Sequence, residues 1–208
     1  MDILITAGAT RNPIDAMRYI SANSSGQTGV WIAEQLHTQH TVHLLGSPEA
    51  LSRCRISCER KAFGSTDDLH DKMHAWLTQH PEGIVIHAAA VGDYAAANPK
   101  LATKIASGVE RLSIELVPTR KIIDHIKQWA PACTLISFKA APPECDATSL
   151  EALAVDQRDR TGSFAVFANV IGAINHGNLI ATDEGVNWYE SRPLAMASLV
   201  SSVLGLNT

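Results

Sequence analysis

The chain has 208 residues, of which 46% are hydrophobic and 18% are charged, and its formal net charge is −4. This length and composition are typical of one α/β domain with a buried core. The acidic balance, without a basic stripe, argues against nucleic acid as a partner. Apolar runs are too short to span a membrane, and the start of the chain lacks the pattern of a secretion signal. We therefore expect a cytoplasmic protein whose four cysteines are free thiols.

Short apolar runs alternate with helical patterns, as in folds built from parallel strands and crossover helices. The runs predict strands at residues 3–7, 41–45, 84–88, 112–116, 133–138 and 164–168. The patterns predict helices at residues 26–37, 67–79, 120–129, 148–158 and 193–204. Residues 178–182 and 186–189 flank a turn and predict an edge hairpin. The sequence thus predicts one α/β domain over residues 1–208, with a Rossmann-like, doubly wound, mostly parallel sheet and helices on both faces.

The loop between the first strand and the first helix is the most informative segment. A strand, a loop of small residues and a helix start recur where proteins hold phosphate, because backbone N–H groups and the helix dipole face the loop. The candidate phosphate contacts in it are Gly8, Thr10, Ser24, Ser25 and Gly26. Their spacing matches neither Gly-x-Gly-x-x-Gly nor a P-loop, so the spacing alone is also consistent with glycines that serve only turns and caps.

The whole segment resembles the phosphate-binding region of the phosphopantothenoylcysteine synthetase (phosphopantothenate–cysteine ligase) family. Members of that family share roughly the pattern T-x-G-x-T-x-x-x-I-D-x-x-R-x-I-x-N-x-S-S/T-G-x-x-G. The positions that match in register are Thr6, Gly8, Thr10, Ile14, Asp15, Arg18, Ile20, Ser24, Ser25, Gly26 and Gly29.

The long loop 89–110 resembles the same family, whose members show A-A-V-x-D-Y followed by a Lys-Ile pair. The resemblance implies that Ala89 and Asp93 contact the nucleotide, with Asp93 holding the nucleotide or its metal. It implies that Lys104 holds the triphosphate and the charge that develops in the transition state. The spacing to Lys104 needs a one-residue insertion, so Lys100 is a second candidate.

Three later segments also resemble the family in its motif order. Thr119 is an expected helix N-cap, and the helix start after it resembles a segment whose backbone meets the nucleotide. The residues of that helix start are Arg120, Lys121, Ile122 and Ile123. Phe138 corresponds to a phenylalanine that packs on the base, and the run from Phe167 to Asn169 resembles the family's I-x-A-N-D.

The chain departs from the family at the position of one asparagine, where Ala22 stands. In the family that asparagine supports the acyl-nucleotide on its way to cysteine, and alanine offers no side-chain hydrogen bond. Asn23 is adjacent and is therefore the candidate to replace it as a catalytic residue.

Other departures lie towards the C-terminus. Without gaps, two lid lysines of the family align with Gln157 and Thr161, so the neighbouring Arg158 and Arg160 become candidate phosphate contacts. Val170 replaces an aspartate, and an arginine replaces the proline that follows Thr119 in register. These differences predict an altered substrate, weak activity or lost activity.

The resemblance implies a free-standing ligase of coenzyme A biosynthesis that uses CTP or ATP with Mg²⁺. It would activate 4′-phosphopantothenate as an acyl-nucleotide and couple it to cysteine. It also implies a homodimer, for which residues 95–97 and the hairpin 178–189 are candidate contact surfaces. No set of residues in the chain is expected to form a metal site of its own.

Two other functions stay open. A divergent relative would join another carboxylate and amine by the same route, and a non-catalytic protein would bind a nucleotide on the same fold. A dinucleotide oxidoreductase is less favoured, because the chain lacks the glycine fingerprint and an acidic residue after the second strand, where residues 43–46 read His-Leu-Leu-Gly.

Overall fold

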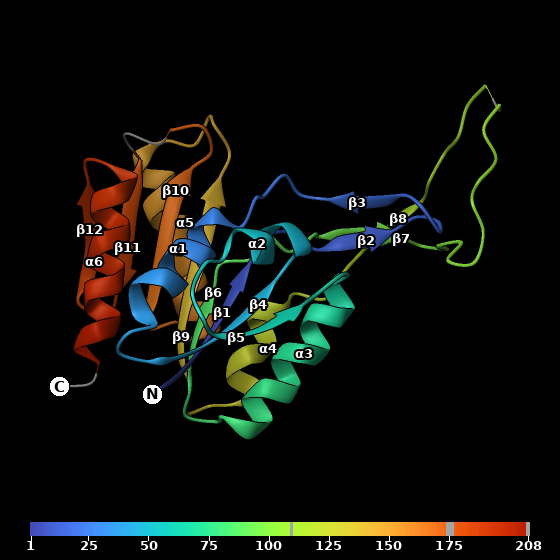
Figure 1. Ribbon diagram of the computed structural model, residues 1–208. Helices are drawn as coiled ribbons and strands as arrows, with labels where there is room; N and C mark the ends of the chain where they lie inside the picture. The colour runs from blue at the N-terminus through green and yellow to red at the C-terminus, as the bar shows by residue number, and fades with distance from the viewer. Residues whose placement is uncertain (109, 174–176, 207–208) are drawn as a thin grey trace.

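The computed structural model describes residues 1–108, 110–173 and 177–206, and an eight-stranded sheet forms its centre (Figure 1). Across the sheet the strand order is β12-β11-β10-β9-β6-β1-β4-β5. The β10–β11 and β11–β12 pairs are antiparallel, and the other pairs are parallel. The bounds are β1 Asp2–Ala7, β4 Thr41–Gly46, β5 Glu59–Ala62, β6 Ile84–His87, β9 Thr134–Ala141, β10 Ala165–Val170, β11 Asn178–Thr182 and β12 Gly185–Tyr189. The predicted Rossmann-like α/β fold and its edge hairpin are confirmed.

Helices cover both faces of the sheet. One face carries α1 Gln27–Leu36, α2 Pro48–Arg53 and α6 Arg192–Gly205, and the other carries α3 Thr66–Gln79, α4 Ile122–Trp129 and α5 Ala147–Thr161. The position of β1 between these two helix layers explains why its sequence is continuously apolar. Ile3 and Ile5 pack under the first group of helices, while Leu4 packs under the second. A parallel strand covered on both sides buries every side chain, so its pattern does not alternate.

Helix α1 lies unusually close to β1, because Gly29 faces the strand. A Cβ at Gly29 would stand 2.7 Å from both the Ala7 Cβ and the Thr6 carbonyl oxygen. Only a residue without a side chain permits this approach. Gly29 therefore fixes the distance between the first strand and the first helix.

Two short hairpins leave the main sheet and form a projecting arm (Figure 1). One consists of β2 Arg11–Pro13 and β3 Tyr19–Ser21, and the other of β7 Tyr94–Ala96 and β8 Leu116–Pro118. The prediction of a main-sheet strand at 112–116 is wrong. Those residues alternate apolar and polar, but Leu112, Ile114 and Leu116 are exposed on the arm and do not join the core.

Smaller differences concern polar or short elements. The sequence did not predict β5, whose residues are all exposed, or α2, which is a single short helix capped by Ser47. Helix α4 begins after Lys121, so Thr119 is not its N-cap. The four cysteines are free thiols. Among the described residues, no helix combines the length and apolar character that crossing a bilayer requires.

Gly29→Ala is expected to destabilise the fold, because the added methyl group must separate α1 from β1. The expected loss in the free energy of unfolding is about 1–3 kcal/mol, measured by urea denaturation. Gly205→Ala is the matched control, since a Cβ there meets no atom within 4 Å, and it should change stability by less than about 0.5 kcal/mol. Equal effects of the two substitutions would contradict the close contact.

Candidate functional site

A crevice is expected between the neighbouring strands β1 and β6. The chain after β1 continues to β4 on one side of this pair, whereas the chain after β6 continues to β9 on the other side. The loops after the two strands meet there. The Ala90 N–H donates to the Gly8 carbonyl at 2.8 Å, and the Thr10 N–H donates to the Ala90 carbonyl at 3.1 Å. In open α/β sheets this switch point is the usual place for a ligand.

Two left-handed glycines shape the loop at this point. Gly8 has φ +92° and packs against Ser47, and Gly26 has φ +76° and is the N-cap of α1. A Cβ at Gly26 would lie 2.8 Å from the Gly8 backbone nitrogen. No side chain caps α1, so backbone N–H groups of its first turn stay available to an anion.

Together, Gly8, Gly26 and Gly29 perform the three tasks of a dinucleotide fingerprint: the tight turn, the close backbone approach and the tight helix packing. The sequence pattern hides this arrangement, because residues 9–25 stand between the first and second glycine. The available signal was the Gly26-x-x-Gly29 spacing across the start of the first helix.

The predicted phosphate loop lines a pocket beside these glycines. Ser24 and Ser25 both line it, and so do Ala22 and Asn23, so an asparagine amide is present one residue from the family position. Arg53, at the end of α2, also lines this pocket and was not predicted.

Thr10 does not belong to the phosphate contacts, because its side chain is fully buried. Its hydroxyl accepts the Gly92 N–H at 2.8 Å and lies 3.2 Å from the Thr66 hydroxyl. Thr10 therefore holds the loop after β6 in place.

A buried pair under the crevice positions Ala89, which was predicted to meet the nucleotide. The Thr6 hydroxyl accepts the Ala89 N–H at 3.0 Å and lies 2.9 Å from Nδ1 of His87. The Thr6 hydroxyl thus links the Ala89 backbone to the imidazole ring of His87. Burial lowers the pKa of His87 to about 4.

The loop after β6 carries Asp93 at the surface, where its carboxylate pairs with Lys121. The Thr119 N–H donates to the Asp93 carbonyl at 2.9 Å. Arg120 points instead to Asp67, at 3.5 Å. Ile122 is buried and Ile123 packs against the same core, so these two residues offer only their backbone to a ligand. The side chains of Arg120 and Lys121 are exposed.

Lys104 lies on the arm and not beside the glycine loop. Asp15 and Arg18 hold the loop that carries it: the Asp15 carboxylate accepts the Ile105 N–H at 3.0 Å, and Arg18 donates to the Ile105 carbonyl at 3.2 Å. The Ile105 N–H, followed by those of Met17 and Arg18, keeps the pKa of Asp15 below its usual range. This clamp explains the Ile-Asp-x-x-Arg part of the sequence motif.

Phe138 stacks on the fully buried Phe167, with ring centroids 5.2 Å apart. The guanidinium of Arg192 lies over the same Phe167 ring, at 4.9 Å from its centroid. Arg192 also donates to Asn169 at 2.9 Å and to Thr28, in the first turn of α1, at 3.1 Å. Burial lowers the pKa of Arg192 from its usual value. No sequence motif marks this arginine, so it was not among the predicted site residues.

The structure does not bring Arg158 and Arg160 to the crevice. They lie in the last turn of α5, where Arg158 binds the Thr182 carbonyl and Arg160 pairs with Asp124. Gln157 and Thr161 are buried beneath α5 in a hydrogen-bonded network with Ser137 and Ser163. These two side chains therefore serve the packing of α5 against the sheet.

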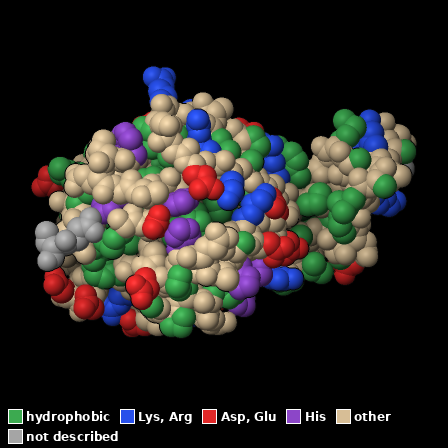
Figure 2. Space-filling model, turned by 60° about the horizontal axis from the view of Figure 1, so that its bottom comes forward, with side chains coloured by type: hydrophobic (Ala, Val, Ile, Leu, Met, Phe, Trp, Pro, Cys, Tyr) green, Lys and Arg blue, Asp and Glu red, His purple; other side chains and the backbone are tan. Residues whose placement is uncertain are grey.

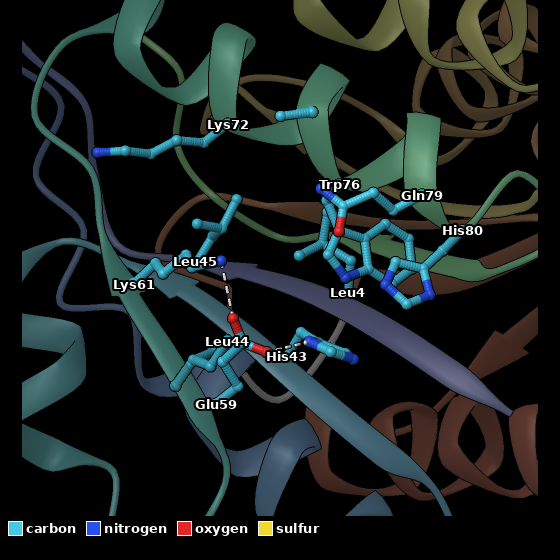
Figure 3. Close-up of a pocket in the computed structure, with 11 residues that line it drawn as sticks. Leu4, His43, Leu44, Leu45, Glu59, Lys61, Lys72, Trp76, Gln79 and His80 are labelled. Atoms are coloured by element: carbon cyan, nitrogen blue, oxygen red, sulfur yellow. Dashed lines mark hydrogen bonds and ion pairs between the residues drawn. The ribbon is translucent and has the colours of Figure 1, made fainter.

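A separate pocket lies between α3 and the strands β4 and β5 (Figure 3). Its aromatic wall consists of His43, Trp76 and His80, and Glu59 lies 3.0 Å from His43. None of its lining residues comes from the loops that follow the carboxyl ends of the strands. We therefore place the candidate site at the glycine loop.

Comparison with known proteins gives matches over most of the chain. A family model described as the DNA/pantothenate metabolism flavoprotein C-terminal domain matches residues 1–186. The Coenzyme A biosynthesis bifunctional protein CoaBC of Thermococcus kodakarensis is 35% identical over 176 residues, which cover 82% of this chain and 41% of that protein. The chain thus spans less than half the length of this relative.

Solved structures share the fold over almost the whole chain. The DNA/pantothenate metabolism flavoprotein from Streptococcus pneumoniae superposes with a TM-score of 0.87 at 23% identity, covering 99% of both chains. The C-terminal domain of a Coenzyme A biosynthesis bifunctional protein CoaBC superposes with a TM-score of 0.74 at 25% identity, covering 99% of this chain and 92% of that one.

The buried His87 predicts a pH dependence of stability. The unfolded chain binds a proton near pH 6.5 that the folded ring binds only near pH 4, so acidification through this window destabilises the fold. The contribution is at most about 1.4 kcal/mol per pH unit. His87→Gln should flatten the stability profile between pH 4.5 and 6.5, measured by urea denaturation. A slope that does not change would show that His87 is not responsible.

Proposed function

Because the chain belongs to the DNA/pantothenate metabolism flavoprotein C-terminal domain family, we propose that it is a phosphopantothenate–cysteine ligase of coenzyme A biosynthesis. The substrates would be 4′-phosphopantothenate, cysteine and CTP or ATP. One observation carries the proposal: the uncapped first turn of α1 faces a split glycine fingerprint at the switch point of the sheet. Such a site holds a nucleotide phosphate through backbone N–H groups.

The reaction would run in two steps. A carboxylate oxygen of the acid attacks the α-phosphorus, pyrophosphate leaves, and the cysteine amine then displaces the nucleotide monophosphate from the acyl-nucleotide. Gly8 and Gly26 let the backbone approach the α-phosphate, and Ser24 and Ser25 add hydroxyl donors. Phe138, half-buried on Phe167, offers its ring to the base.

Mg²⁺ fits this site only as an ion shared with the nucleotide. Asp93 presents an exposed carboxylate whose one ion pair among the described residues is with Lys121. Mg²⁺ commonly binds one or two carboxylates together with substrate phosphates, so Asp93 is the residue that would hold it. The bound ion would neutralise charge on the phosphates during transfer.

Asn23 is the proposed replacement for the missing amide at Ala22, since both residues line the pocket of the phosphate loop. The alanine also motivates a second candidate function, in which the same activated intermediate is passed to a different amine. Because the cysteines are free thiols, we place either reaction in the cytoplasm, where thiols stay reduced.

We also propose that the protein forms a homodimer through its arm. Large apolar side chains are exposed on it, and Figure 2 shows hydrophobic groups gathered on the projecting lobe. Exposed apolar patches of this kind mark protein contacts. The exposed residues are Met17, Tyr19, Tyr94, Leu101, Leu112, Ile114, Leu116 and Val117. A dimer would let the arm of one subunit present Lys104 to the site of the other.

Pyrophosphate release tests the ligase proposal. Purified protein is assayed with Mg²⁺, 4′-phosphopantothenate and either CTP or ATP, with and without cysteine. Cysteine-dependent turnover and the amide product are expected, and Lys104→Ala should lower turnover about a hundredfold. A single burst without turnover would favour a different amine. No release with either nucleotide would contradict activation of this acid, and a Lys104→Ala protein with full activity would remove that lysine from the mechanism.

Leu116→Asp tests the arm as a dimer contact. The buried charge should convert a dimer into a monomer in sedimentation experiments, with an unchanged circular dichroism spectrum. Lys61→Asp, on the exposed edge strand β5, is the control and should leave the mass unchanged. A wild-type protein that sediments as a monomer would contradict the proposed dimer.

A further inference from the structure

A broad groove lies on the outer side of the candidate site, where α1, α2 and α6 meet. The first turn of α1 forms one wall with Gln27 and Thr28, and Pro193 and Met196 of α6 form the other. Trp31, which is 37% exposed, provides an aromatic surface within it. The groove is therefore an open, partly apolar channel beside the positive end of α1.

Three arginines from different parts of the chain line this groove. Arg53 ends α2, Arg55 follows it, and Arg192 begins α6. Among the described residues, none of the three makes an ion pair with a carboxylate. The one acidic residue that lines the groove is Glu34.

This concentration of positive charge is unexpected in a chain with a net charge of −4. Like charges that face one groove repel one another, and a half-buried guanidinium held only by neutral groups lacks a counter-charge. Arg192 is such a group, because its two hydrogen-bond partners are the Asn169 amide oxygen and the Thr28 hydroxyl. The arrangement is favourable when an anion with several negative oxygens occupies the groove.

The groove is connected to the phosphate loop through Arg53. That residue lines both the groove and the pocket formed by Ser24 and Ser25. From the other side, Arg192 reaches the first turn of α1 through Thr28. A chain of phosphates that begins at the loop would therefore meet Arg53 first and the groove beyond it.

We propose that this groove binds the β- and γ-phosphates of the nucleotide and then the pyrophosphate product, with Arg53, Arg55 and Arg192 as the binding groups. The inference rests on the proposed ligase function. As a carboxylate oxygen bonds to the α-phosphorus, the bridging bond between the α-phosphorus and the β-phosphate oxygen breaks. The electron pair of that bond leaves with pyrophosphate, whose growing charge the three guanidinium groups stabilise.

Binding of inorganic pyrophosphate and tripolyphosphate to the full chain tests the groove without any turnover. Calorimetry should show that Arg53→Gln and Arg192→Gln each weaken both anions about tenfold or more. Arg192→Lys should recover part of that loss. Lys61→Gln removes the same charge from β5, and it should stay within about twofold of the wild type.

Trp31 provides a local readout of the same binding. Its fluorescence should change on addition of pyrophosphate, and Trp31→Phe should remove the change while calorimetry still reports binding. If Arg192→Gln fails to fold, Arg53→Gln is sufficient for the test, because Arg53 is exposed. Unchanged pyrophosphate affinity in Arg53→Gln, or binding without any change in Trp31 emission, would overturn the inference.

The two proposals fail separately. If the protein binds pyrophosphate in the groove but never turns over the acid, the groove proposal stands and the ligase proposal is refuted. If turnover is normal but substitution of the three arginines leaves the pyrophosphate affinity unchanged, only the groove proposal is refuted.

Discussion

The contact between the first strand and the first helix, made without side chains, determines the geometry of the whole candidate site. Gly29 lets α1 press against β1, and Gly26 lets the start of that helix approach the backbone of Gly8. Any Cβ at these positions would separate the two elements. Because they stay together, backbone N–H groups of α1 open directly onto the switch point, where the loops after β1 and β6 meet.

The segment that hides the glycine fingerprint also builds the arm. Residues 9–25 leave the fold between Gly8 and Gly26, and their hairpin lies beside the one formed by β7 and β8. Asn12 joins the two hairpins through the Tyr94 carbonyl at 2.9 Å, and Asp15 holds the Ile105 N–H. The segment 9–25 therefore separates Gly8 from Gly26 in the sequence and also supports the loop that carries Lys104.

The two sides of the first turn of α1 differ in charge. On the inner side, the neutral pair of Thr6 and His87 positions the Ala89 backbone without any fixed charge. On the outer side, Arg53 and Arg192 bring positive charge to the helix terminus. A polyanion that crosses this terminus would meet backbone N–H groups first and guanidinium groups next.

The sequence by itself determined the α/β class, most of the parallel strands, the helices that cover them and the edge hairpin, because continuous apolar strands and amphipathic helices carry local signals. The order of the strands across the sheet came from the structure. It also marked Gly8, Gly26, Ser24 and Ser25, whose small side chains follow a strand and precede a helix. Only the tertiary structure decided which polar side chains lie at the candidate site. The hydroxyl of Thr10 turned out to be buried, and Arg192 reached the site from the last helix. A one-dimensional pattern does not specify which side chains of distant elements meet, since that depends on the packing of the completed sheet.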